Sequence, residues 1–104
     1  DTLIVIDHGR KIAEGSPRQL IAEHIEPQVV EAYDEAGGDL PAFVEANRDL
    51  AGRVETSGET AFFYCSDPRP LLARLAEAPG LRYVHRASNL EDVFIRLTGR
   101  ELRD

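Results

Sequence analysis

The chain has 104 residues, of which 42% are hydrophobic and 30% charged, a balance typical of one globular domain, or of a small domain with part of another. Its net charge of −7 argues against a nucleic-acid partner, because such sites cluster Lys and Arg. No apolar run approaches the ~20 residues of a membrane span, so direct membrane insertion is not expected. The one cysteine, Cys65, cannot form an internal disulfide, which favours a cytoplasmic compartment.

The first 24 residues predict a hairpin and a short helix. Strands are expected over residues 3–6 and 11–14, with Asp7-His8-Gly9-Arg10 as the turn. Ser16 is a good N-cap, and Pro17 a good first residue, for a helix that ends near Glu23. The first strand is apolar on both faces, which predicts that both are covered; its residues are Leu3, Ile4, Val5 and Ile6.

After a junction at residues 25–27, the pattern predicts strands over 28–33, 53–57, 60–65 and 81–87. Helices are expected over 40–50, capped by Asp39, and after Asp67-Pro68. The order β-α-β-β-α-β is that of a ferredoxin-like fold, so the fold class is α+β.

A last helix is predicted from its apolar spacing, and Ser88 and Glu91 have the spacing of its capping box. Gly99 ends this helix, and a charged tail follows over residues 100–104. The apolar positions of the helix are Leu90, Val93, Phe94 and Leu97.

The histidines and the cysteine give no pattern of a catalytic or metal site. Asp7 and His8 are neighbours, but they lie in a turn, where a solvated pair is expected. His24 and His85 fall in other elements, without metal-ligand spacing. Cys65 ends an apolar strand without a basic neighbour, so it is expected to be a buried small hydrophobe. We therefore predict no catalytic residue and no metal site.

Two acidic segments also give no pattern of a functional site. Glu55 and Glu59 flank a hairpin turn, where carboxylates are expected to be solvated. Gly37-Gly38-Asp39 precedes a helix and could bind an anion, but Glu35 and Asp39 repel anions, which favours an ordinary loop. The chain contains no Gly-x-x-x-x-Gly-Lys-[Ser/Thr] phosphate loop.

The aromatic run Phe62-Phe63-Tyr64 predicts a strand that is apolar on both faces. Phe63 must point away from the side that Phe62 and Tyr64 share. One face is expected to pack on helices. The other could be covered by the last helix or by another subunit.

Two stretches carry a family resemblance. The opening, "LIVIDHGRKIAEGSPRQLI", resembles the segment that closes the nucleotide-binding domain of ABC transporter ATPases. The end, "NLEDVFIRLTGRELRD", resembles the C-terminal signature of exporter ATPases that pair with ABC-2-type permeases. These include drug-resistance and nodulation lipo-oligosaccharide exporters.

The resemblance implies that residues 1–24 close an ABC ATPase domain and that residues 25–104 form an accessory C-terminal domain. ATP and Mg²⁺ would be used by motifs upstream of residue 1, so this chain would bind no cofactor and hydrolyse no ATP. The implied partners are a second copy and an ABC-2-type permease, on the cytoplasmic side of the inner membrane.

The expected role is dimerisation or regulation of the ATPase. The interface hypothesis groups the last helix and the aromatic strand and adds the first strand, which is expected to pair with another copy or to fold back on the C-terminal domain. Its residues are Phe62, Phe63, Tyr64, Val93, Phe94, Leu97, Leu3, Ile4, Val5 and Ile6. Alternatives are a small-molecule sensor with a pocket beside Tyr64 and Tyr83, and a free-standing small enzyme.

Overall fold

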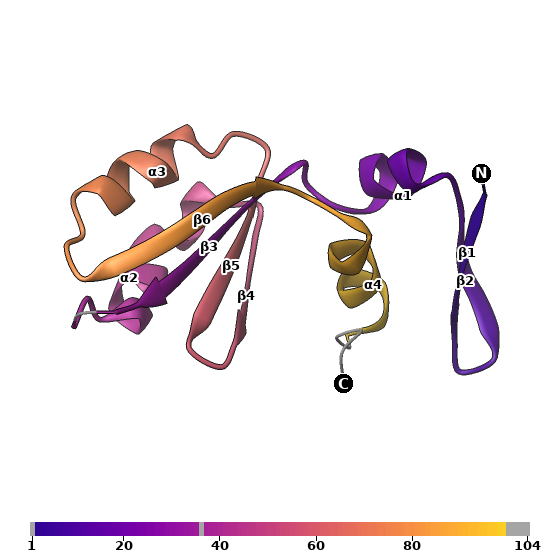
Figure 1. The fold of residues 1–104 in the computed structure, drawn as a ribbon, viewed down its shortest axis with the longest axis horizontal. Helices are drawn as coiled ribbons and strands as arrows, with labels where there is room; N and C mark the ends of the chain where they lie inside the picture. The colour runs from indigo at the N-terminus through magenta and orange to yellow at the C-terminus, as the bar shows by residue number, and fades with distance from the viewer. Residues whose placement is uncertain (1, 36, 100–104) are drawn as a thin grey trace. The chain divides into compact units, whose positions relative to one another are not determined.

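The computed structural model describes residues 2–35 and 37–99 (Figure 1). The chain forms two compact units. One is Gln28–Ala87, and the other holds the described residues up to Pro27 together with those from Ser88 onward. The predicted charged tail, residues 100–104, lies outside the described residues, as do Asp1 and Ala36.

The unit Gln28–Ala87 is a four-stranded antiparallel sheet with two helices, which confirms the predicted α+β, ferredoxin-like fold. The sheet has the strand order β4-β5-β3-β6 (Figure 1), so β4 and β6 are its edges. The strands are β3 (Gln28–Asp34), β4 (Arg53–Ser57), β5 (Thr60–Cys65) and β6 (Leu81–Ala87), and the helices are α2 (Leu40–Asn47) and α3 (Arg69–Ala76).

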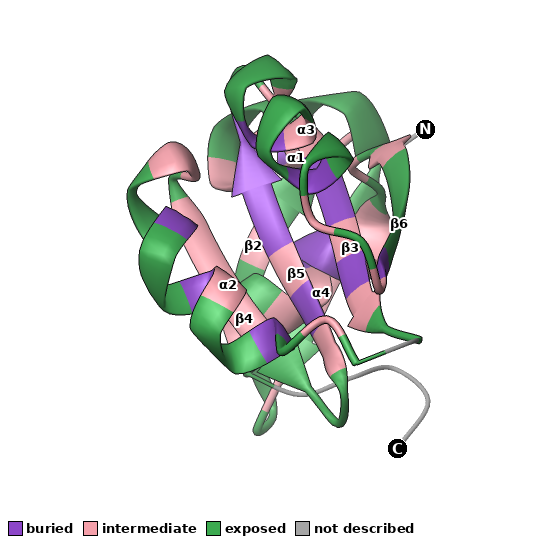
Figure 2. Ribbon diagram, turned by 90° about the vertical axis from the view of Figure 1, so that its left-hand side faces the viewer, coloured by how far each residue is buried: buried purple, intermediate pink, exposed green. Residues whose placement is uncertain are grey.

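The core of this unit lies between one face of the sheet and both helices. Val30 of β3 pairs with Phe63 of β5, and both side chains are fully buried. Leu40 of α2 and Leu71 of α3 belong to the same apolar cluster. Figure 2 shows that buried residues concentrate on the central strands β3 and β5. The alternation of β3 and β5 therefore puts every second residue into the core.

Helix α2 is shorter than the predicted helix over residues 40–50. It ends at Asn47, and a 3₁₀ turn, η1 (Arg48–Leu50), follows. Asn47 leaves helical geometry with φ −124° and ψ 13°, and its Nδ2 donates a hydrogen bond to the carbonyl oxygen of Phe43 at 2.9 Å. This side chain competes for the last-turn carbonyls, which the apolar pattern did not reveal.

The other unit begins with the predicted hairpin, β1 (Leu3–Asp7) and β2 (Arg10–Gly15). His8 and Gly9 both have positive φ, 54° and 74°, as a tight type I′ turn requires. Helix α1 (Pro17–His24) follows. Its cap is reciprocal, because the Ser16 side chain accepts from the Gln19 amide while the Gln19 side chain accepts from the Ser16 amide.

Helix α4 (Leu90–Thr98) packs against α1 in the same unit. The predicted Ser88–Glu91 capping box is wrong by one residue, since Asn89 and Asp92 form it. Ser88 is engaged elsewhere: its hydroxyl donates to the Glu26 carbonyl, and its amide donates to the Pro27 carbonyl at 3.0 Å. Among the described helices, none is both long and apolar enough to cross a membrane.

Candidate functional site

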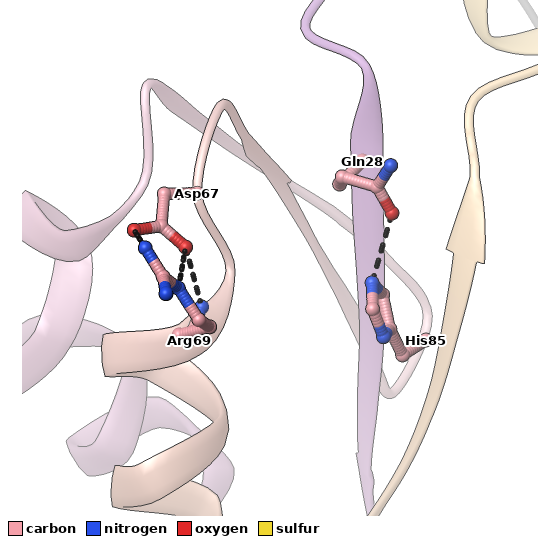
Figure 3. Close-up of polar contacts among 4 residues, drawn as sticks. All are labelled: Gln28, Asp67, Arg69 and His85. Carbon is pink, nitrogen blue, oxygen red and sulfur yellow. Dashed lines mark hydrogen bonds and ion pairs between the residues drawn. The ribbon is translucent and has the colours of Figure 1, made fainter.

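His8 and His85 have different surroundings. His8 is highly exposed in the hairpin turn, and its Nε2 lies 3.6 Å from an Asp7 carboxylate oxygen. The Asp7 side chain is only 11% exposed, so the predicted solvation holds for His8 and not for Asp7. His85 lies on β6, where its Nε2 is 2.9 Å from the Gln28 side-chain oxygen (Figure 3). Among residues 2–35 and 37–99, no three His, Cys, Asp or Glu side chains gather as a metal site would.

Cys65 is buried at the end of β5, as its sequence context predicts. Its Sγ lies 3.8 Å from the Phe63 carbonyl oxygen. A thiol buried in this way behaves as a small hydrophobe, because a nucleophile needs exposure and a lowered pKa.

The two glycine amides of the loop before α2 donate to the preceding strand. The Gly37 and Gly38 amides donate to one carboxylate oxygen of Asp34, at 2.9 and 3.0 Å. Asp39 then caps α2 by accepting from the Ala42 amide. The predicted ordinary loop is therefore observed, and the residue that organises it, Asp34, was missed by sequence reasoning.

An ion pair that the sequence did not suggest lies at the start of α3. The Arg69 guanidinium donates to both carboxylate oxygens of Asp67, at 2.9 and 3.0 Å (Figure 3). This side-chain hydrogen bond holds the pKa of Asp67 below its usual range and raises that of Arg69. Both side chains are exposed, so the pair orders the helix start and contributes little to stability.

The carboxylates that flank the β4–β5 turn have separate surroundings. Glu55 accepts a hydrogen bond from Arg53, and the Arg53 guanidinium carbon lies 3.9 Å from the centre of the Tyr64 ring. This arrangement is a cation–π contact on the sheet face opposite Phe63. Glu59 is exposed in the turn, so the two carboxylates do not form an acid–base pair.

A pocket of about 440 Å³ lies between α2 and the β4–β5 hairpin. Leu40 and Val44 contribute apolar surface, and Asp34, Glu45 and Glu59 contribute carboxylates. Arg48 also lines it, with its guanidinium 3.0 Å from Glu45. This pocket is not beside Tyr64 or Tyr83, where the sensor alternative expects one.

Residues of the interface hypothesis differ in exposure. Phe63, Tyr64 and Val93 are buried, so these three present no surface to a partner. Phe62, Phe94 and Leu97 are half-buried. These three residues of the aromatic strand and the last helix retain accessible surface. An interface through them stays a prediction.

The exposed large apolar side chains lie instead on the hairpin and on β6. Ile4 and Ile6 of β1 are 55% and 59% exposed, and Leu3 and Ile12 are exposed to a smaller degree. Cover of this strand by the C-terminal domain and pairing with another copy both stay predictions. An isolated two-stranded hairpin has too little packing surface to cover its own apolar side chains.

Comparison with known proteins identifies the family. The family model for the C-terminal domain of the nodulation factor export protein NodI matches residues 41–99, which run from the first turn of α2 to the end of α4. The chain belongs to the NodI C-terminal domain family. The resemblance noted at the two ends of the sequence is thereby confirmed.

Curated relatives of this NodI-type chain are called Nod factor export ATP-binding protein I. The relative from Ralstonia nicotianae is 56% identical over 110 residues, the one from Burkholderia orbicola 54% over 104, and the one from Cupriavidus metallidurans 54% over 102. These alignments cover 98–100% of the chain and 33% of each relative. The chain thus spans about a third of their length. No solved structure matched.

Proposed function

We propose that this chain is the non-catalytic, accessory C-terminal part of the ATP-binding subunit of an ABC-type exporter. The observation that carries the proposal is the coverage of the relatives: nearly all of the chain aligns with about a third of proteins that are called ATP-binding. The family match to a C-terminal domain supports the same conclusion. In the longer protein, ATP and Mg²⁺ bind outside these residues.

The β1–β2 hairpin and α1 are the part of the chain that closes the ATPase domain in this proposal. The exposed apolar side chains Ile4 and Ile6 support it, because covering the 55% and 59% of these side chains that is still exposed would contribute about 1–2 kcal/mol each. Ile4 and Ile6 lie in the stretch that resembles the end of a nucleotide-binding domain.

The unit Gln28–Ala87 is proposed to hold two ATP-binding subunits together and so to regulate their turnover. The subunits act at the cytoplasmic side of the inner membrane, bound to an ABC-2-type permease. The chain's net charge of −7 argues against nucleic acid as a further partner. The small-molecule sensor remains an alternative, with no support from the pocket at α2.

ATP turnover tests the non-catalytic assignment. The purified 104-residue chain is expected to hydrolyse MgATP no faster than buffer, because its sequence holds no phosphate-binding loop. The full-length Ralstonia nicotianae relative provides the positive control under identical conditions. Saturable, Mg²⁺-dependent hydrolysis that copurifies with the chain would contradict the proposal.

A further inference from the structure

Strand β6 is one of the two edge strands of the unit Gln28–Ala87, the other being the five-residue β4. β6 is seven residues long and pairs with β3 on one side, in a continuous register from Gln28 to Asp34. Tyr83 and Val84 are 44% and 49% exposed and point to opposite faces. Proteins commonly block such edges with short strands, bulges, proline or charged side chains, above all lysine. Strand β6 has no bulge, proline or lysine, and its charged side chains are Arg82 and Arg86.

Three polar contacts of the β6 side chains run to β3 or to the loop after it, and a fourth runs to the β6 backbone, from Arg86 Nη1 to the carbonyl oxygen of Ala87 at 3.1 Å. Arg86 Nε donates to Glu31 Oε2 at 2.5 Å, and Arg82 Nε donates to Glu35 Oε1 at 3.0 Å. His85 lies 2.9 Å from the Gln28 side-chain oxygen (Figure 3). All three contacts are to side chains of β3 or of the loop directly after it, so none of these three uses a backbone group of β6.

The sequence of this edge is nearly symmetric about Val84: Arg82-Tyr83-Val84-His85-Arg86. If two copies pair antiparallel about a two-fold axis at Val84, each Val84 faces the other. Tyr83 then faces the second copy's equivalent of His85, and aromatic cross-strand pairs of this kind are stabilising. Arg82 faces the equivalent of Arg86. Each of these arginines already forms an ion pair within its own chain, Arg82 with Glu35 and Arg86 with Glu31.

We propose that β6 pairs with β6 of a second copy, which joins two four-stranded sheets into one continuous sheet. This inference rests on the proposed dimer-forming role and names its surface. The symmetric edge favours a second copy over an acidic segment of another protein, which would match the basic side chains but not the symmetry. Strand pairing buries less than the ~800 Å² per partner of a standard interface, so the dimer is weak unless the longer protein holds the copies together.

Cysteine crosslinking of the 104-residue chain tests the pairing. In a Cys65→Ala background, Val84→Cys is compared with Thr56→Cys, which lies exposed on the opposite edge strand, β4. Facing residues at the axis have Cβ atoms about 4.5–5.5 Å apart, so Val84→Cys is expected to form disulfide dimers about tenfold faster, because pairing makes the reaction intramolecular. Equal rates, or no crosslink at Val84→Cys, would overturn the proposal.

Sedimentation equilibrium on Val84→Lys separates this inference from the dimer-forming role. A lysine on the edge should weaken self-association about tenfold while leaving the melting temperature unchanged, because edge lysines oppose strand pairing. Dimers that persist in Val84→Lys would leave the dimer-forming role intact and refute pairing through β6. Absence of self-association in the unsubstituted chain at millimolar concentration would refute pairing through β6 as a property of this chain.

Discussion

Replacing Phe63 with alanine is expected to destabilise the chain by about 4 kcal/mol, as buried phenylalanine truncations do. Phe63 is fully buried in the centre of β5. Its ring meets the ring of Phe43 edge-to-face, with centroids 6.1 Å apart. The substitution removes both the aromatic contact and the apolar filling between the sheet and α2.

Phe62→Ala is the matched control, because this neighbouring side chain points to the other face and is only half-buried. Its expected cost is about 1 kcal/mol, in proportion to the smaller area withdrawn from water. Urea unfolding followed by far-ultraviolet circular dichroism measures both variants. A Phe63→Ala loss no larger than that of Phe62→Ala would show that the core is not where the structure has it.

Replacing Gly38 with alanine is expected to cost about 3 kcal/mol, the upper range for overpacking a tight contact. A Cβ at Gly38 would lie 2.7 Å from two side-chain carbons of Leu81 and 2.8 Å from the carbonyl carbon of Gly80. The backbone there cannot step aside easily, since the Gly80 oxygen accepts from the Glu35 amide at 2.9 Å.

Gly37→Ala is the control for Gly38→Ala. Gly37 has φ +78° and no atom within 4 Å of an added Cβ, so its substitution adds only the ~1 kcal/mol strain of a left-handed alanine. The same unfolding assay separates the two effects. If Gly38→Ala costs no more than Gly37→Ala, the close approach of the α2 loop to the start of β6 is not present in solution.

The helices and strands could be predicted from the sequence because alternation and capping depend on residues that are close together along the chain. Alternation at residues 60–65 assigned Phe62 and Phe63 to opposite faces, and Ser16 with Pro17 marked the start of α1. The same logic failed at Ser88, since its hydroxyl and amide bind Glu26 and Pro27, more than 60 residues away along the chain. Asn89 was then left to cap α4.

The candidate interaction surface could not be predicted in the same way. Which of the strands is an edge depends on strand order, and the apolar pattern of a single strand does not reveal that order. The aromatic strand at Phe63 looked like a partner surface for that reason, yet it is central and buried. Tyr83 and Val84, in a less apolar strand, are the exposed ones.

The accessory role can be tested in the longer protein by removing the unit Gln28–Ala87. The amide of Ser88 donates to the carbonyl of Pro27 at 3.0 Å, so the two ends of the unit Gln28–Ala87 are adjacent. A short Gly-Ser linker can therefore replace this unit while α1 keeps its partner α4. The remaining residues of the ATP-binding subunit are unchanged.

ATP hydrolysis as a function of protein concentration, measured on the intact subunit and on this excision variant, tests whether Gln28–Ala87 holds two subunits together. The excision variant is expected to reach half of its full specific activity at about tenfold higher protein concentration, a loss of about 1.4 kcal/mol in dimer stability. Superimposable curves for the two proteins would contradict a role for Gln28–Ala87 in holding the subunits together.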